Sequence, residues 1–267
     1  MTTKRETSGN ESAEEIIVVE SDEVARLSAT RIAAVLASAV ARRGRADWAT
    51  TGGSMAPAIY RCLTDDPLRD AVPWEHVHVW WGDDRFVPRD HPLSNVKPLD
   101  DILLDAEHGI RIPNTNLHPF RSTESLGGGW DAAWTADQLA HELRAEGLPL
   151  RDGWPILDLI ILGVGGDGHI LSVFPGSAAF DSRSWTLAIP APTHIEPHVE
   201  RVTFHPACVG VAGSVLVAAT GAGKAAILAD IFGETRDPQR LPAQLARRAG
   251  ATWILDPAAA ALLPDRG

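Results

Sequence analysis

One short segment of the chain, residues 163–169, holds the residue types most able to do acid–base chemistry. It reads Gly-Val-Gly-Gly-Asp-Gly-His and ends at His169. An imidazole titrates near neutral pH, so His169 can take a proton from a water molecule. Backbone amides of a glycine loop at the start of a helix can also stabilise a developing oxyanion. The segment therefore predicts general-base chemistry on water, with His169 as the base.

The same glycines match the dinucleotide-binding pattern Gly-x-Gly-x-x-Gly at Gly163, Gly165 and Gly168. That pattern requires an acidic residue about 20 positions further on, at the end of the next strand, to bind a ribose. Asp181 lies near that distance, but no apolar strand precedes it. The glycines alone are also typical of an ordinary strand-to-helix turn. We therefore do not expect a dinucleotide site.

A second glycine-rich segment, residues 221–224, ends in Lys224. A P-loop would need glycine at Ala218 and serine or threonine at Ala225, so the nucleotide interpretation fails. A lysine at the start of a helix after a strand can still bind a phosphate, although it can equally be a solvated surface lysine. Lys224 is thus a candidate phosphate contact.

Two arginines extend this set of cations. Arg85 follows Asp83 and Asp84, so its simplest role is a salt bridge with one of them. Arg201 begins an expected strand, and its simplest role is that of a surface charge. A phosphorylated substrate, however, requires two or three cations placed together. Arg85 and Arg201 therefore join Lys224 as candidate phosphate ligands.

A metal site has little support in the sequence. The motif His-Glu-x-x-His does not occur, and Asp167 with His169 would supply only two ligands. The other histidines are scattered, which predicts surface or loop positions. The nine tryptophans form no regular stripe that would stack nucleic-acid bases, so we expect them to anchor the core and loops.

Alternating strand and helix patterns must position these residues. Strands are expected at 16–20, 46–51, 76–81, 157–162, 186–189, 201–204, 215–220 and 252–255. Helices are expected at about 22–43, 55–63, 130–146, 224–232, 242–248 and 257–263. In the third of them Trp130 and Trp134 should face inward. Residues 111–129 should be mostly loop. This alternation predicts a mostly parallel α/β sheet flanked by helices. We expect a disordered tail over residues 1–15 and a single domain over residues 16–267.

Ligands of open parallel sheets bind beyond the carboxyl ends of the strands. Four expected strand ends carry the unusual residues of this chain. They are Gly52-Gly53-Ser54, Asp83-Asp84-Arg85, residues 163–169 and residues 221–224. Their shared position is a stronger indication of a site than any one motif.

Composition excludes several other classes of protein. The chain of 267 residues has 24 Lys and Arg against 35 Asp and Glu, a net charge of −11. Nucleic-acid and membrane-surface binding both need clustered cations, and no apolar run in the sequence approaches the roughly 20 residues that span a bilayer. Cys62 and Cys208 lie far apart, and the first fifteen residues are too polar for a signal peptide. We expect a cytoplasmic enzyme.

Together the strand-end motifs resemble those of the 6-phosphogluconolactonase family, from Thr51 to about Leu263. Residues 162–176 are similar to the family's Leu-Gly-x-Gly-x-Asp-Gly-His segment ending in Phe-Pro-Gly. Residues 80–88, followed by Ser94-Asn95, are similar to its Gly-Asp-Glu-Arg-x-Val-Pro segment and Ser-Asn pair. Two departures occur: residues 52–57 read Gly-Gly-Ser-Met-Ala-Pro instead of Gly-Gly-Ser-Thr-Pro, and Asp84 replaces the family's glutamate.

The resemblance implies hydrolysis of 6-phosphogluconolactone in the oxidative pentose phosphate pathway, without a metal or organic cofactor. It also implies the parallel-sheet fold shared with glucosamine-6-phosphate deaminase, ribose-5-phosphate isomerase and CoA transferases. His169 would activate water, and either Asp167 or Asp83 would orient its imidazole. The residues expected to bind the phosphorylated sugar lactone are Gly52, Gly53, Ser54, Arg85, Arg201 and Lys224.

Two alternatives to this function stay open at the level of sequence. One is a sugar-phosphate deaminase or isomerase of the same superfamily. The other is a sensor that binds a sugar phosphate without catalysis, which would need a DNA-binding segment. Residues 82–88 and the Phe174-Pro175-Gly176 ending favour the lactonase over the first alternative, and the acidic N-terminal residues are too few for the helix-turn-helix of the second.

Overall fold

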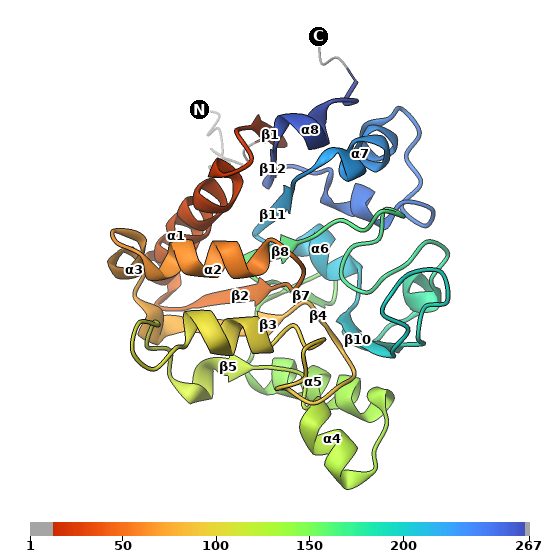
Figure 1. Ribbon diagram of the computed structural model, residues 1–267. Coiled ribbons are helices and arrows are strands. Elements are labelled where there is room, and N and C mark those ends of the chain that lie inside the picture. The colour runs from red at the N-terminus through yellow and green to blue at the C-terminus, as the bar shows by residue number, and fades with distance from the viewer. Residues whose placement is uncertain (1–12, 265–267) are drawn as a thin grey trace, which may run out of the picture.

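A fully parallel, seven-stranded sheet runs through the computed structural model, which describes residues 13–264 (Figure 1). Its strands lie in the order β1-β12-β11-β8-β2-β3-β5. Their bounds are Glu15–Val18 (β1), Ala46–Thr50 (β2), Val77–Trp81 (β3), Leu117–His118 (β5), Leu159–Leu162 (β8), Ser214–Ala219 (β11) and Ala251–Leu255 (β12). The predicted parallel α/β sheet is confirmed.

Strands β8 and β2 lie side by side near the centre of this sheet, and every residue in both is buried. β8 contains only leucine and isoleucine, as expected of a strand that is covered on both faces. From β2 the chain continues outward to β3, whereas from β8 it continues in the opposite direction to β11. This reversal opens a crevice at the carboxyl ends of β2 and β8, where ligands bind in sheets of this kind.

Helices cover the sheet, and the longest of them, α1 (Glu23–Arg43), packs against β2, β8, β11 and β12 beside α2 (Ala56–Thr64). Among the described residues α1 alone has the length and apolar composition that could cross a membrane. Its residues Val24, Ile32 and Leu36 are completely buried, so the core of the fold accounts for its apolar face. The other helices are α3 (Leu68–Ala71), α4 (Ser122–Gly128), α5 (Ala132–Ala145), α6 (Ala207–Val211), α7 (Ala225–Phe232) and α8 (Pro257–Ala260).

A second, antiparallel sheet of three strands adjoins the carboxyl edge of the first. Its order is β4-β10-β9, with bounds Asp83–Arg85 (β4), Arg201–Phe204 (β10) and Thr186–Ile189 (β9). We expected Asp83–Arg85 to be a loop, but after Gly82 the chain turns away from the large sheet and pairs with β10. A short hairpin, β6 (Leu150–Arg151) and β7 (Trp154–Pro155), completes the strands.

Other expectations about local structure were wrong. Residues 111–129, expected to be loop, contain β5 and α4. Trp130 does not face inward, because Asp131 caps α5 and Trp130 precedes the helix. It is 46% exposed and stacks on Trp134, with 4.2 Å between the ring centroids.

The tail expected over residues 1–15 falls largely on residues 1–12, which lie outside the described residues. Its expected end is wrong, because Glu15 already belongs to β1 and pairs with Thr252 of β12. The parallel sheet thus begins one residue earlier than the apolar pattern indicated.

Candidate active site

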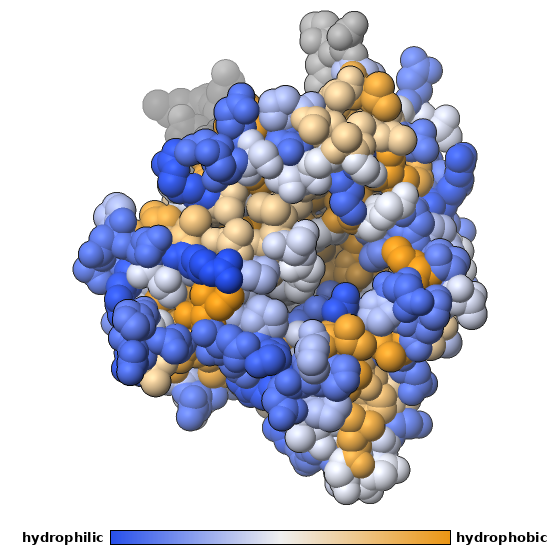
Figure 2. Space-filling view, in the orientation of Figure 1, coloured by the Kyte–Doolittle hydropathy of each residue, from blue (hydrophilic) through white to orange (hydrophobic). Residues whose placement is uncertain are grey.

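A hollow of about 560 Å³ opens at the crevice between β2, β3 and β8. In the orientation of Figure 1 the surface is hollowed near its centre (Figure 2). Three of the predicted strand ends contribute to its wall, together with residues from the small sheet and the segment after β8. The lining residues that carry chemistry are Gly52, Gly53, Asp83, Arg85, Asn95, His169, Ser172 and Arg201.

Asp167 and His169 form a dyad at this wall. The Nδ1 atom of His169 lies 2.6 Å from Oδ1 of Asp167, and the backbone amide of His169 donates to the same oxygen at 3.1 Å. Because Asp167 accepts the Nδ1 proton, the Nε2 atom of His169 is left unprotonated and able to act as a base. Asp83 makes no such contact, so of the two candidate partners Asp167 is the one that holds the imidazole.

A second histidine, which we did not single out from the sequence, contacts the same carboxylate. Nε2 of His194 lies 2.9 Å from Oδ2 of Asp167, and the ring of Phe174 contacts both imidazoles, tilted against His169 and edge-on to His194. Partial burial acts to raise the pKa of Asp167, but the hydrogen bonds and charges of His169 and His194 hold it well below its ordinary value. Asp167 is therefore a carboxylate at any pH at which the protein would work.

The loop that carries the dyad closes on itself. The amide of Gly165 donates to the carbonyl of His169 at 2.9 Å, and Gly168, at φ +83°, donates to the carbonyl of Gly165 at 3.1 Å. We expected a helix to begin here, but none follows until a short turn at Ala178–Asp181. The amides of Gly165 and Gly168 are thus engaged within the loop, and the remaining amides of the segment, without a helix dipole, are what it offers to an oxyanion.

Gly165 leaves no room for a side chain, which gives a first prediction. A Cβ atom there would lie 2.0 Å from Nδ1 of His169 and 2.6 Å from Oδ1 of Asp167. We expect Gly165→Ala to displace the imidazole and lower kcat by about 10²-fold, the effect of an ångström-scale misplacement of a catalytic group. Steady-state kinetics measure this loss.

Gly166 provides the matched control, since a Cβ atom there meets nothing within 4 Å. Gly166→Ala is expected to keep nearly full activity. Equal losses in the two variants would show that the dyad geometry does not set the rate.

Two guanidinium groups lie opposite each other across the small sheet. Arg85 on β4 and Arg201 on β10 are register partners, and both line the hollow. Arg201 is only 4% exposed, and burial together with the charge of Arg85 lowers its pKa. Like charges directly opposite in a sheet repel each other. An anion bound between them would relieve that repulsion.

These arginines are held by backbone carbonyls. Arg85 donates to Leu93 at 2.8 Å, and Arg201 donates to Pro197 at 2.8 Å and to Val199 at 3.2 Å. Neither forms an ion pair with a carboxylate among residues 13–264, so the salt bridge considered for Arg85 is not made. The Nε atom of Arg85 is buried and has no hydrogen-bond partner. Both side chains therefore keep donors for a ligand.

Asp83 and Asp84 organise the rest of this wall. Asp83 accepts a 2.6 Å hydrogen bond from the hydroxyl of Ser172, and its carbonyl accepts one at 2.9 Å from the side chain of Asn95. Asp84 accepts from the backbone amides of Asn95 at 2.7 Å and of Arg85 at 2.8 Å. Ser172 and Asn95 lie in motifs that we had noted, but the sequence did not indicate their role. They are the groups that connect β4 to the hollow.

Asp84 also gives a prediction about stability. Burial, with a smaller contribution from the charge of Asp83, raises the pKa of Asp84 from 3.8 to about 7, against the opposing effect of its hydrogen bonds. Between these pH values the folded state holds a proton that the unfolded chain has lost, so the contribution of Asp84 to stability is largest below pH 3.8 and falls as pH rises to about 7. The full rise in pKa corresponds to about 4 kcal/mol.

The variant Asp84→Asn keeps the shape of this side chain and removes its titration. We expect urea unfolding between about pH 4 and pH 8 to show a shallower decline of stability for the variant than for the natural protein. Parallel curves for the two proteins would contradict a raised pKa at Asp84.

Ser54 and Lys224 lie in a neighbouring hollow of about 650 Å³, which shares Gly52 and Gly53 with the first. The Nζ atom of Lys224 donates to the carbonyl of Val164 at 2.6 Å. We expected Lys224 to lie with the two arginines. The structure instead places Lys224 in the second hollow and the arginines in the first. Pro57 falls in the first turn of α2, so the departure in this loop is compatible with the helix.

Fold and site together define a class of protein: a parallel α/β protein with a histidine–aspartate dyad and paired arginines at the carboxyl edge of its sheet. Comparison with known proteins is more specific. The chain belongs to the family described as glucosamine-6-phosphate isomerases/6-phosphogluconolactonase, whose profile matches residues 19–254.

Several proteins that are similar to this chain in sequence or in structure are named as 6-phosphogluconolactonases. The chain is 33% identical to the 6-phosphogluconolactonase of Synechocystis over 83% of this chain and 86% of the relative. It is also 33% identical to that of Mycobacterium tuberculosis, over 93% of this chain and 98% of the relative. The solved 6-phosphogluconolactonase of Trypanosoma cruzi matches with a TM-score of 0.82 at 25% identity, covering 94% of this chain and 97% of that one.

A structure of another activity has the same fold. A monomeric glucosamine-6-phosphate deaminase matches with a TM-score of 0.74 at 15% identity, covering 93% of this chain and 99% of the deaminase. At this identity the match shows the fold alone.

Proposed function

We propose that this chain hydrolyses 6-phospho-D-glucono-1,5-lactone to 6-phospho-D-gluconate, the lactonase step of the oxidative pentose phosphate pathway. The observation that carries the proposal is one hollow lined by His169, which Asp167 holds, and by both arginines of the Arg85–Arg201 pair. The dyad supplies a base for water, and the arginines supply a site for a phosphate. Relatives of 33% identity that are named as 6-phosphogluconolactonases support the same activity.

In the proposed mechanism, Nε2 of His169 removes a proton from a water molecule whose oxygen attacks C1 of the lactone. The carbonyl of C1 becomes an oxyanion, which the amides of the glycine loops near Gly52 and Val164 would stabilise. When the oxyanion reforms the carbonyl, the bond between C1 and the ring oxygen breaks, and His169 returns its proton to that oxygen. Asp167 keeps the imidazole in the required tautomer and stabilises its cation.

The phosphate would lie between Arg85 and Arg201, where it offsets the repulsion between the two guanidinium groups. Lys224 lies in the adjoining hollow, which shares the wall at Gly52 and Gly53. Its hydrogen bond to Val164 uses one of the three donors of the ammonium group, so the other two are left for a ligand. We assign to Lys224, with Ser54, contacts to the sugar end of the ligand or to a phosphate oxygen that reaches across this wall.

Removing one arginine tests the phosphate site. Arg201→Gln is expected to raise KM for the phosphorylated lactone roughly 10–100-fold, the value of hydrogen bonds to a charged group, and to change kcat less. Arg89→Gln is the control, because Arg89 pairs with Asp100 at 2.6 Å and does not line the hollow. A loss confined to kcat in Arg201→Gln would contradict a role in phosphate binding.

A coupled assay tests the proposed function itself. Freshly generated 6-phosphogluconolactone is supplied, its spontaneous hydrolysis is subtracted, and formation of 6-phosphogluconate is followed. We expect a rate proportional to protein concentration. Binding of the sugar phosphate without turnover would instead favour the non-catalytic sensor.

The location of the protein remains a prediction. We propose a cytoplasmic location, although some relatives are named as chloroplastic. Fractionation of cells that express the tagged protein would decide between the compartments.

A further inference from the structure

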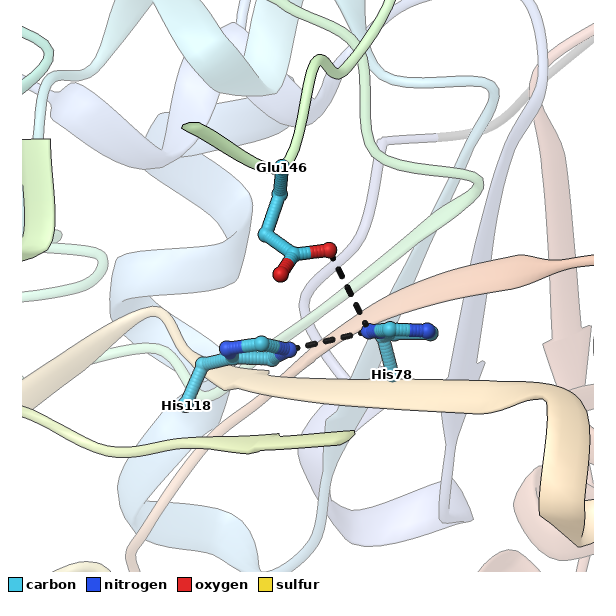
Figure 3. A group of neighbouring side chains, drawn as sticks. All are labelled: His78, His118 and Glu146. Carbon is cyan, nitrogen blue, oxygen red and sulfur yellow. Dashed lines mark hydrogen bonds and ion pairs between the residues drawn. The ribbon is translucent and has the colours of Figure 1, made fainter. Parts of the chain in front are cut away.

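A second cluster of titratable side chains lies on another part of the fold. It consists of His78 on β3, His118 on β5 and Glu146 at the end of α5 (Figure 3). One ligand atom from each residue lies within 4.8 Å of those of the other two. His78 is near the amino end of β3, whereas the hollow of the dyad is built at the carboxyl ends of the strands. None of the three residues lines that hollow.

The two imidazoles point their nitrogens at each other. Nδ1 of His78 lies 2.9 Å from Nε2 of His118, and Nδ1 of His118 lies 2.6 Å from a carboxylate oxygen of Glu142. Since Glu142 accepts the Nδ1 proton of His118, the Nε2 atom of that ring carries a free electron pair. The proton on Nδ1 of His78 therefore occupies the space between the two rings. Moving that proton to the other nitrogen of His78 would leave two electron pairs aimed at one point.

Glu146 completes a three-ligand set. Its Oε2 atom lies 3.8 Å from Nδ1 of His78. Arg45 also donates to Oε2, at 2.7 Å, which leaves the other carboxylate oxygen for a ligand. Two imidazoles and one carboxylate are a typical zinc ligand set, whose nitrogens lie about 3.3 Å apart around a tetrahedral ion. The observed 2.9 Å between the imidazole nitrogens is close to that spacing.

The surroundings of the cluster are those of a metal ligand shell. The hydrogen bond from His118 to Glu142 fixes the ring and its tautomer, as the outer partners of zinc-binding histidines do. Trp80 stacks on His118 at 3.9 Å and holds the ring in place. Glu146 is 30% exposed and His78 16%, so an ion can enter from solvent.

We propose that His78, His118 and Glu146 bind a divalent transition-metal ion of the zinc type, which joins the edge strand β5 to β3 and to the end of α5. The ion takes the place of the proton between the two imidazoles, and the site leaves a fourth position for water. β5 has only two residues, so this connection would strengthen the weakest strand of the sheet. The site is structural and independent of the lactonase chemistry.

Isothermal titration calorimetry of the full chain with Zn²⁺ tests this inference. We expect the natural protein to bind one more Zn²⁺ than Glu146→Gln or His78→Gln, or to bind it at least 10-fold more tightly. Glu142→Gln, which keeps the three ligands, should weaken binding roughly 10–100-fold. Zn²⁺ should also raise the Tm of the natural protein, and raise it less in the two ligand variants.

His108→Gln is the matched control, because His108 is an exposed histidine paired only with Asp105. It should bind Zn²⁺ as the natural protein does. Circular dichroism of each variant without metal confirms that it is folded. Co²⁺ in place of Zn²⁺ should give the visible absorption of a tetrahedral site, and that absorption should be absent in Glu146→Gln.

Equal Zn²⁺ affinity, stoichiometry and Co²⁺ absorption in the natural protein and both folded ligand variants would overturn the proposal. So would the absence of any Zn²⁺ binding, and the cluster would then be a hydrogen-bond network only. Lactone hydrolysis is expected to be unchanged in Glu146→Gln. Failure of the lactonase assay would leave the metal titration unaffected, so the two proposals fail separately.

Discussion

Replacing His169 by alanine is expected to lower kcat for lactone hydrolysis by about 10²–10⁴-fold, the contribution of a positioned general base. His169 is the group whose Nε2 atom is free, because Asp167 holds Nδ1 at 2.6 Å. His194 contacts the far oxygen of the same carboxylate but does not line the hollow, so it is not placed to replace His169. Steady-state kinetics with fresh lactone, corrected for spontaneous hydrolysis, provide the measurement.

The variant should remain folded, because the imidazole is partly exposed and lies outside the main core. KM should change little, since the arginine pair is intact. A variant with the same kcat as the natural protein would show that His169 is not the base.

Asp167→Asn is expected to have the second-largest effect, a fall in kcat of about 10²–10⁴-fold with the fold intact. An amide at this position can donate to Nδ1, which would leave the proton on Nε2 and so remove the base. The amide also no longer stabilises the imidazolium that forms in the transition state. A plot of kcat against pH for both proteins separates the loss of the correct tautomer from a simple shift in titration.

Asp83→Asn tests the other carboxylate that the sequence had left open. Asp83 bonds to Ser172 and Asn95 and does not touch His169, so we expect a smaller loss than for Asp167→Asn. The reverse order of the two losses would mean that Asp83 orients the base in the substrate complex.

The strands of the large sheet other than β5 were predictable because they are short and rich in apolar or β-forming residues. β9 and β10 were placed at their observed bounds, and β8 was recognised from its unbroken apolar run. β4 and β5 were missed for a physical reason. β4 consists of Asp-Asp-Arg, whose stability comes from pairing with β10 and from the hydrogen bonds of Asp84, neither of which is visible in local propensity.

The candidate site was predicted in part. Motifs at strand ends indicated His169, Asp167 and Arg85, because topology brings strand ends to one edge, whereas Arg201, at the start of an expected strand, was a candidate because of its charge. Which acid contacts His169 depends on side-chain geometry, so sequence left that choice open. His194 lies on a loop 27 residues from Asp167, with no motif to mark it.

The net charge of −11 is another property of the sequence that does not predict the charge of the site. An acidic protein with an anionic substrate appears contradictory only when charge is averaged over the surface. Arg85 and Arg201 lie within one hollow and act at contact distance, whereas charges beyond a Debye length of about 8 Å are largely screened. The global charge favours solubility and carries no information about the hollow.

The most direct test of the account is a pair of initial rates from one preparation of the natural protein. One reaction contains 6-phosphogluconolactone and is followed by formation of 6-phosphogluconate, and the other contains glucosamine 6-phosphate and is followed by release of ammonia. The account predicts accelerated lactone hydrolysis and no ammonia. Release of ammonia without acceleration of lactone hydrolysis would contradict it and would assign the dyad to a deaminase.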